Sequence, residues 1–347
     1  MSFVPLLLDR FDIRADLSEI DVERLIHAPN LTVVQTRRPL SCQSWALLND
    51  RLIKRRPEIQ IRIYDQGLSQ FDLSILEYLP DVENLELDYL QSVSNFNFVL
   101  RLQKLKSISV DIFNLETFEF LESLPQDIEK VSLGKTKSKK PSLKGLAKLK
   151  NIRELHIEGQ AKDIHAIGEL CKLEKLVLRS VTSCDIRFIR SLPRLWSLEI
   201  KLGGISDLSP LAGLANLKYL ELWQVRGLSN LSVLGSLTGL QFLFLQSLIN
   251  VTELPDMRSL KALRRVYLES MKGLQNLDGL AKAPVLEEFI HLCALNFDPE
   301  HYESLIGMPS LRRGFFGVSN EKKNKRVEAL MKEHGVEQYK HEVFQFR

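Results

Sequence analysis

The chain has 347 residues, of which 44% are hydrophobic and 26% are charged, as in an ordinary soluble globular protein. That composition disfavours a disordered, collagen-like or coiled-coil chain. The 47 Lys and Arg residues are nearly balanced by 44 Asp and Glu residues, so the formal net charge is only +3. Bulk charge therefore does not favour nucleic acid or a membrane as the main partner, because proteins that bind polyanions usually carry a clear basic excess.

Cysteine usage and the first residues favour a cytoplasmic location. The four cysteines, Cys42, Cys171, Cys184 and Cys293, form no CxxC pair, which argues against a disulfide framework and against a zinc ribbon. The start, MSFVPLLLDRF, has no basic segment before its apolar run and so lacks the parts of a secretory signal peptide. We expect a cytoplasmic chain. An effector secreted by a signal-independent route is the alternative.

Residues 1–56 predict an N-terminal cap made of a helix, a strand and a second helix. The first helix is expected from Ser18, whose side chain is placed to cap it and is followed three residues later by Asp21. The apolar segment LTVV predicts the strand, and SWALLNDRLIKR predicts the second helix. Such a cap would cover the apolar end of whatever follows it.

Residues 57–317 contain one pattern that returns about every 23 residues: apolar, two variable, apolar, one variable, apolar. Its alternating segments, such as LEL and LFL, predict strands with one buried face. Leucines three apart, such as Leu208 and Leu211, predict 3₁₀ segments between the strands. Because one repeat cannot bury its own leucines, neighbouring repeats must stack into a parallel sheet. The pattern occurs in 11 copies, and a weaker twelfth copy is centred on Gly314. The central apolar residues of the 11 copies are Ile61, Leu85, Ile108, Val131, Leu155, Leu176, Leu198, Leu220, Leu243, Val266 and Phe289.

LxxLxL at intervals of 21 to 24 residues resembles the leucine-rich repeat superfamily, and runs such as ISDLSPLAGLANLKYLEL are most similar to the bacterial internalin-like subclass of short repeats. The resemblance implies an α/β solenoid: a leucine-rich repeat horseshoe with a parallel concave sheet, a 3₁₀ or irregular convex side, and helical caps. It also implies a protein-binding role.

The repeats depart from this family in one column. Leucine-rich repeats usually have Asn three residues after the last apolar position of the strand, where its side chain satisfies backbone groups of the turn. Here the column has no Asn, so we expect backbone contacts or waters to replace it and the apolar members to point into the core. The column consists of Leu90, Phe113, Thr136, Gln160, Val181, Gly203, Val225, Leu248, Met271 and Ala294.

Residues 318–347 predict a C-terminal cap. NEKKNKRVEALMKEHG is expected to form a helix that begins at Asn320 and ends at Gly335. The alternating segment YKHEVFQFR, which follows it, predicts a strand.

Catalytic, cofactor and metal motifs are not found. The sequence contains no GxxxxGK[ST], no GxGxxG after a strand, no GxSxG and no HExxH. The seven histidines are scattered, and Cys184 beside Asp185 is interpreted as a structural cysteine. We therefore expect no catalytic residue, no cofactor and no bound metal.

The outward positions of the later strands predict a binding surface on the concave face. Aromatic residues beside charged ones provide a large contact area and groups that fix orientation. The alternatives are that these rings only pack on one another, are covered by a loop, or mediate self-association. The predicted site comprises Glu199, Lys201, Tyr219, Glu221, Trp223, Phe242, Phe244, Arg265, Tyr267 and Glu269.

A second candidate surface is basic. The lysines of GKTKSKKPSLK predict either a solvated loop or a patch that binds an acidic protein or nucleic acid. They are Lys135, Lys137, Lys139, Lys140 and Lys144, called the basic patch below. The sequence favours a non-enzymatic module that binds a protein or peptide on its concave face, as an adaptor, an immunity protein or an effector. The alternative function is a nucleic-acid-associated or regulatory protein that uses the basic patch.

Overall fold

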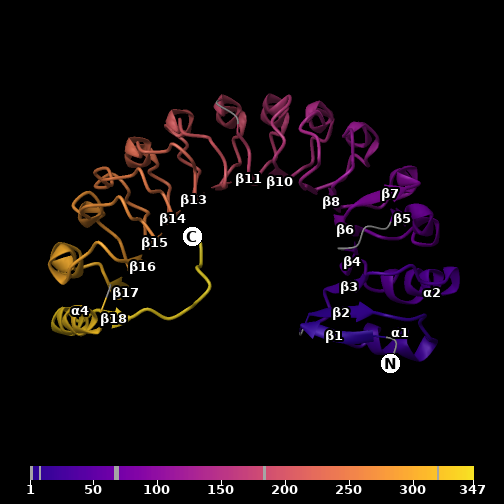
Figure 1. Cartoon of the computed structure of the whole chain (residues 1–347), viewed down its shortest axis with the longest axis horizontal. Helices are drawn as coiled ribbons and strands as arrows, with labels where there is room; N and C mark the ends of the chain where they lie inside the picture. The colour runs from indigo at the N-terminus through magenta and orange to yellow at the C-terminus, as the bar shows by residue number, and fades with distance from the viewer. Residues whose placement is uncertain (1–2, 8, 66–69, 183–184, 319) are drawn as a thin grey trace. The chain divides into compact units, whose positions relative to one another are not determined.

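The structure, a computed structural model, describes residues 3–7, 9–65, 70–182, 185–318 and 320–347. The chain forms two compact units, Met1–Lys172 and Leu173–Arg347. In each unit, parallel strands line one side of the stack and short 3₁₀ segments line the other (Figure 1). The side chains that alternate away from the core on the strand side form what is called here the concave face.

The first unit contains a cap and the first repeats. Strand β1 pairs with β2 in antiparallel orientation, a hairpin that the sequence did not predict, and the later strands are parallel. Strands β5 and β7 form a separate two-stranded sheet. The strands are β1 Phe3–Leu7, β2 Arg10–Ile13, β3 Val33–Thr36, β4 Gln60–Tyr64, β5 Gln70–Asp72, β6 Asn84–Leu90, β7 Ser92–Ser94, β8 Ser107–Ile112, β9 Lys130–Leu133 and β10 Glu154–Glu158. The 3₁₀ segments are Leu73–Tyr78, Phe96–Arg101, Glu119–Ser123, Lys144–Lys148 and Ile164–Glu169.

The N-terminal helices form where the sequence predicts them. Helix α1, Glu19–Ile26, begins with a capping box in which Ser18 and Asp21 satisfy each other's backbone N–H groups. Helix α2, Cys42–Leu47, is capped by Ser41 and continues as a π-helical turn, Leu48–Ile53. The LTVV segment supplies strand β3.

The second unit contains the remaining repeats and the C-terminal cap. All neighbouring pairs from β11 to β18 are parallel. The strands are β11 Lys175–Arg179, β12 Ser197–Lys201, β13 Tyr219–Trp223, β14 Phe242–Gln246, β15 Arg265–Glu269, β16 Glu288–Ala294, β17 Arg313–Val318 and β18 Glu337–Gln338. The 3₁₀ segments are Arg187–Ser191, Ser209–Leu211, Ser232–Ser236, Leu280–Lys282 and Pro299–Tyr302, and the helices are α3 Glu303–Ile306 and α4 Glu321–Glu333.

Strand β13 illustrates how the repeat builds the core. Leu220 and Leu222 are fully buried, whereas Tyr219, Glu221 and Trp223 alternate with them on the concave face. The same alternation in β11 and β14 confirms the predicted side of each strand. Because the strands are in register, the outward side chains of neighbouring repeats form rows across the sheet.

Backbone hydrogen bonds stabilise the turns after the strands, where the usual Asn is absent. The residue after each strand from β11 to β15 adopts a left-handed conformation, for example Leu202 with φ 55° and Gln224 with φ 50°. Its N–H donates to a carbonyl of the next strand, at 2.8 Å from Leu202 to Trp223 and at 2.8 Å from Gln224 to Gln246. The reversed residue turns the next side chain inward, so Val225 is buried. The expected replacement of Asn by backbone contacts is thereby confirmed at these turns.

Two members of that column in the first unit behave differently. Phe113 is 36% exposed, so the expectation that it points into the core is wrong. Gln160 is buried and donates a hydrogen bond of 2.6 Å to the Thr136 hydroxyl, a side-chain contact in place of a backbone one.

The C-terminal cap follows the prediction only in part. Helix α4 is capped by the Asn320 side chain, buries Val327 and Met331, and is followed by Gly335 at φ +69°. The strand of this cap is the two-residue β18, Glu337–Gln338, whereas the segment YKHEVFQFR, in which a strand was expected, begins after β18 and forms no strand. Residues Tyr339–Arg347, called the strap below, instead run back across the concave face of the second unit toward β14 and β13 (Figure 1). The division predicted at residues 56 and 317 stays a prediction.

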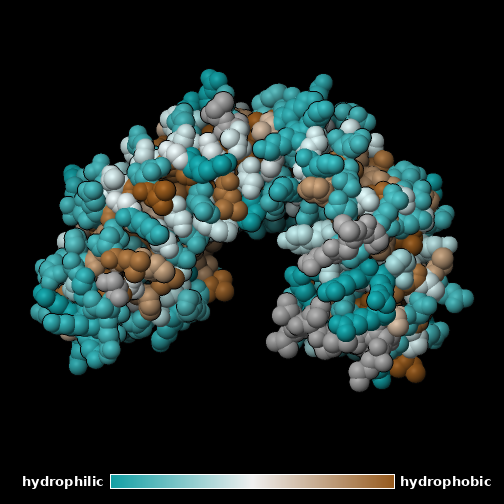
Figure 2. Space-filling view, in the orientation of Figure 1, coloured by the Kyte–Doolittle hydropathy of each residue, from teal (hydrophilic) through white to brown (hydrophobic). Residues whose placement is uncertain are grey.

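The surface of each unit is mainly hydrophilic, with apolar side chains in separate spots on the face that Figure 2 shows. Among the described residues, none of the helices combines the length and the hydrophobicity that crossing a membrane requires.

Candidate interaction surface

Three aromatic residues of the predicted site lie on neighbouring strands and are half-buried. Phe244 and Tyr267 stack with their ring centroids 4.7 Å apart and their planes 20° from parallel. Trp223 packs against Arg179, whose guanidinium carbon is 5.6 Å from a ring centroid of the indole. Burial raises the pKa of Tyr267, with a further contribution from the Glu269 carboxylate. Rings held in this way lose little side-chain entropy when they bind.

A charged group lies beside these rings. The Lys201 ammonium contacts Glu199 at 2.5 Å and Glu221 at 3.1 Å. Burial alone would lower the pKa of Lys201, but its hydrogen bonds and ion pairs with the two glutamates outweigh burial and hold the pKa above its usual value. The Tyr219 hydroxyl donates to Glu221 at 2.7 Å. Lys201 therefore stays protonated, with its charge balanced by two carboxylates on adjacent strands.

The strap covers the other part of the predicted site. The Phe344 ring lies 5.3 Å from the ring of Phe242, and the Phe346 ring lies 6.2 Å from the ring of Tyr219. Arg265 is only 5% exposed, because Tyr339 and Phe344 both pack against its guanidinium. The prediction that these residues form an exposed surface is corrected by this covering segment, which was one of the alternatives considered.

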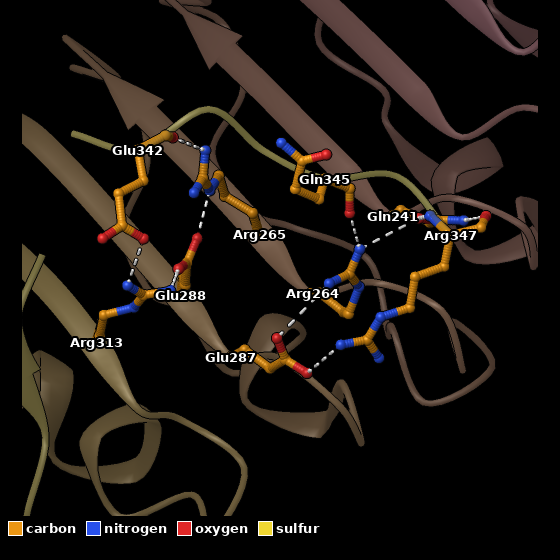
Figure 3. A network of polar contacts seen from close by, with 9 residues as sticks. All are labelled: Gln241, Arg264, Arg265, Glu287, Glu288, Arg313, Glu342, Gln345 and Arg347. Carbon is orange, nitrogen blue, oxygen red and sulfur yellow. Dashed lines mark hydrogen bonds and ion pairs between the residues drawn. The ribbon is translucent and has the colours of Figure 1, made fainter. Parts of the chain in front are cut away.

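Four side chains hold the backbone of the strap, and Figure 3 shows three of them, Gln241, Arg264 and Arg265. Lys218 and Gln241 donate to the Arg347 carbonyl at 2.9 and 2.8 Å. Arg264 donates to the Gln345 carbonyl, and Arg265 donates to the Glu342 carbonyl at 3.2 Å. The Gln241 side-chain oxygen also accepts from the Arg347 N–H at 2.8 Å. These contacts fix the path of the strap through main-chain groups, which every residue type has.

Buried charges lie beneath the strap. Arg265 and Glu288 form an ion pair whose side chains are each 6% exposed. Arg313 contacts Glu288 as well and reaches the Glu342 carboxylate of the strap at 2.9 Å. Figure 3 shows these side chains from β15, β16 and β17 converging on the strap. Both partners are satisfied here, which a buried ion pair requires if it is not to destabilise the fold.

The predicted site is thus divided into two groups. The residues that the strap leaves open are Glu199, Lys201, Glu221, Trp223, Phe244, Tyr267 and Glu269, called the open cluster below. The strap covers Trp196, Lys218, Tyr219, Gln241, Phe242, Arg264 and Arg265, called the covered row below. The prediction missed four members of the covered row, because each lies one residue before the start of a strand: Trp196, Lys218, Gln241 and Arg264. The sequence signal that could have indicated the covering segment was the alternation of Phe344 and Phe346 near the end of the strap.

The basic patch lies in the first unit, on the segment that leaves β9 and on the start of the following 3₁₀ segment. All five of its lysines are exposed. Nearby lysines are paired instead: Lys148 contacts Glu122 at 2.5 Å, and Lys150 contacts Glu169 at 3.1 Å. The basic patch therefore presents its charge to solvent.

His291 and the cysteines are side chains whose chemistry could support catalysis or metal binding. His291 is fully buried, and its Nδ1 is hydrogen-bonded to the Tyr302 hydroxyl at 3.0 Å. Cys42, Cys171 and Cys293 are free and exposed. Within the part of the chain that the structure describes, no three His, Cys, Asp or Glu side chains gather as a metal site would require. Cys184 lies outside the described residues.

Comparison with solved structures finds leucine-rich repeat proteins. An internalin, InlF, from Listeria monocytogenes has a TM-score of 0.56 and 18% identity, over 88% of this chain and 90% of its own. A leucine-rich repeat protein from Leptospira interrogans has a TM-score of 0.55 and 18% identity, over 93% of this chain and 92% of its own. TLR13, in its complex with ssRNA13, has a TM-score of 0.56 and 18% identity, over 92% of this chain and 50% of its own.

These likenesses define the class of protein. The chain is a leucine-rich repeat solenoid, and its structural neighbours are internalins and other leucine-rich repeat proteins, as the repeat predicted. At identities this low, the likeness shows the fold alone. No family model matches the sequence, and no curated protein matches it.

Proposed function

We propose that the protein is a non-enzymatic interaction module that binds a protein or peptide partner on the concave face of its second unit, at the open cluster. The observation that supports this most directly is the stacked pair Phe244 and Tyr267 beside Trp223 on three adjacent strands. Large rings surrounded by oriented charges are typical of the residues that dominate binding energy in interfaces. The leucine-rich repeat fold of the structural neighbours agrees with a binding role.

The mechanism we propose is recognition by a rigid surface. The rings are already ordered by the sheet, and Lys201 is already fixed between Glu199 and Glu221. Because little conformational freedom remains to be lost, more of the contact energy appears as affinity. The pairing of Lys201 also neutralises part of the acidic rim, so apolar contacts should supply most of the affinity and charges most of the orientation.

The test is capture of the partner with a triple variant, Trp223→Ala, Phe244→Ala and Tyr267→Ala. Wild-type protein and variant are immobilised, incubated with lysate of the native host and washed at low and high salt. We expect a protein that wild type retains at high salt and the variant loses. A matched control replaces three exposed apolar residues elsewhere: Phe113→Ala, Ile249→Ala and Leu295→Ala. Capture that is equal with the folded triple variant would overturn the site.

A second candidate function is supported by the exposed lysines of the basic patch. Five ammonium groups that face solvent would attract nucleic acid or an acidic protein, as the alternative function requires. TLR13 in complex with ssRNA13 shows RNA bound to a protein of this fold. The same capture experiment separates the two functions, because a polyanion held by lysines is released by salt and is retained equally by the aromatic triple variant.

Two further parts of the proposal concern catalysis and location. We propose no catalytic residue, and an activity in hydrolase or nucleotide-turnover screens that a point substitution removes would contradict this. We propose a cytoplasmic location, with which the exposed free thiols of Cys42, Cys171 and Cys293 agree. Fractionation of the native host tests it. The role as adaptor, immunity protein or effector then follows from the identity of the captured partner.

A further inference from the structure

We propose that the covered row is a second binding groove, for an extended peptide with two aromatic residues separated by one residue, and that the strap occupies this groove as an internal ligand. The inference rests on the proposed binding function and specifies one class of partner and its place on the same face. It requires the strap to leave before the partner binds.

The first reason is that the groove recognises main chain rather than particular strap residues. Gln241 accepts from the N–H of Arg347 and donates to its carbonyl, so one side-chain amide pairs with the backbone as a neighbouring strand would. Arg264 and Arg265 donate to two further carbonyls, of Gln345 and Glu342. Any extended peptide presents the same groups, which is how edge-binding domains obtain affinity without sequence identity.

The second reason is that the groove provides two aromatic sites at the spacing of alternate residues. Phe344 lies among Phe242 and two guanidinium groups, at 4.6 Å from Arg264 and 4.9 Å from Arg265. Phe346 lies 5.1 Å from Trp196 and 6.2 Å from Tyr219. In an extended chain, side chains two apart point to the same side, so one peptide fills both sites.

The residues between and before the two rings contribute no such anchor. Gln345 is exposed, and the apolar side chain of Val343 is 85% exposed. A partner is therefore free to vary at these positions. The specificity that the groove imposes is aromatic, any residue, aromatic, with cation–π contacts favouring the first ring.

The third reason is that the strap does not fill the groove. Beyond Phe346, a pocket of about 450 Å³ continues along the strand starts, lined by Pro193, Trp196, Asn216 and Lys218 together with Phe346 itself. A partner peptide that extends past the second ring has room there for further residues. The strap itself uses the part of the groove that runs from Arg265 on β15 to Trp196, just before β12.

The strap is also placed to leave at low cost. Most of its residues are exposed, so its own contacts are few compared with those of a core strand. Tyr339 and Phe344 of the strap pack on the Arg265 guanidinium, so we expect water to reach the ion pair of Arg265 and Glu288 when the strap lifts. Opening thus replaces buried ion pairs by hydrated ones instead of exposing core leucines.

The experiment measures binding of a fluorescein-labelled peptide with the strap sequence, YKHEVFQFR, by fluorescence anisotropy. The proteins are the full wild-type chain, the full chain with Phe344→Ser and Phe346→Ser, and a control with Val343→Ser on the same strap. A tethered segment competes at an effective concentration of order mM. We therefore expect the double variant to bind the peptide about tenfold more tightly, or more, than wild type and the control do.

A second peptide with serine in place of both phenylalanines should lose binding to the double variant. Equal affinity of the strap peptide for wild type and double variant, or equal affinity of the two peptides, would overturn the inference. Both results leave the proposed function standing if the Trp223, Phe244 and Tyr267 variant still loses its partner. If instead the peptides behave as expected but the Trp223, Phe244 and Tyr267 variant still captures its partner, the open cluster is refuted as a binding site and the groove is not.

Hydrogen exchange on the unmodified protein keeps the test decisive if the double variant fails to fold. We expect the amides of Gln345 and Arg347 to exchange through local opening, at least tenfold faster than the amides of β13 and β14. Protection of the strap equal to that of these strands would show a fixed structural element and overturn the inference.

Discussion

The side-chain amide of Gln241 and the backbone of Arg347 exchange two hydrogen bonds, each 2.8 Å long. Gln241 is 7% exposed, and its own backbone N–H donates to the Lys218 carbonyl, while its carbonyl accepts from Arg264 and Arg265. The sheet therefore holds this amide in a fixed position. The strap adds its last residue to a donor and an acceptor that the repeats have already oriented.

Replacement of Gln241 by alanine should loosen the strap at Arg347. Both hydrogen bonds are lost, which costs about 1 to 2 kcal/mol of local stability because each is worth about 1 kcal/mol. We expect the Arg347 amide to exchange about tenfold faster, measured by hydrogen exchange with mass spectrometry. Gln246→Ala is the matched control, since this glutamine ends the same strand, β14, away from the strap. Equal exchange in both variants would show that Gln241 does not hold the strap.

Glu288→Gln should release the strap instead of unfolding the unit. Removing one partner of a buried ion pair usually costs about 3 to 5 kcal/mol, because the other charge is left without water. Here Arg265 is buried by the strap, which can lift and let water reach the guanidinium. We expect a smaller loss, about 1 to 2 kcal/mol in urea denaturation, together with faster exchange in the strap. A loss of about 3 to 5 kcal/mol in the free energy of unfolding, with the strap amides still protected from hydrogen exchange, would contradict this.

The repeat could be predicted because its information is local. Leu220 and Leu222 are two residues apart, and the alternation of apolar and polar side chains places them on the core side before any contact is known. Ser18 with Asp21 and Asn320 with Gly335 mark helix ends through contacts within a few residues. The predicted fold class followed from these signals alone.

The strap could not be predicted in the same way. Phe344 and Phe346 alternate as a strand would, but their partners, such as Phe242 and Trp196, lie more than 100 positions earlier in the chain. Alternation predicts an extended segment and does not say whether a strand edge or the face of a sheet receives it. Arg265 was predicted to be exposed for the same reason, since its position on β15 is outward and the sequence does not show that Tyr339 and Phe344 of the strap pack on its guanidinium.

The stability of the second unit should decrease as the pH falls below about 6.5, because of His291. Burial lowers the pKa of its imidazole to about 3, and its Nε2 has no hydrogen-bond partner among the described residues. As the pH falls from 6.5 toward 3, the unfolded chain binds this proton and the folded chain does not. Stability then decreases by up to about 1.4 kcal/mol per pH unit.

His291→Gln is the variant that isolates this effect, since an amide can still pair with the Tyr302 hydroxyl without titrating. Urea denaturation of wild type and variant is compared at pH 7.5 and pH 5.0, so that the contributions of other groups cancel. We expect the difference in stability to shift in favour of the variant at the lower pH. An unchanged difference would show that His291 is not neutral in the fold at pH 5.0.

Asp111 on β8 should show the opposite dependence. Burial, with repulsion from Asp88 and Glu158, raises the pKa of its carboxyl to about 6. Since the unfolded value is about 3.8, the folded chain holds this proton more tightly, and the fold loses stability as the pH rises from 3.8 to 6. Above pH 6 the loss is complete and constant. The ionised carboxylate is then a half-buried charge close to two others of its own sign.

Asp111→Asn should therefore stabilise the first unit at pH 8 and have little effect near pH 4. We expect a gain on the order of 1 kcal/mol at pH 8, reduced by solvent screening at this half-buried site. The amide oxygen can accept the Tyr89 N–H as the carboxylate does, so Tyr89, near the end of β6, keeps its hydrogen bond. Asp127→Asn, at an exposed position of the same unit, is the control for a change of net charge. An equal gain in both variants would assign the effect to net charge, whereas a gain for Asp111→Asn alone that vanishes near pH 4 would establish the buried carboxylate as its cause.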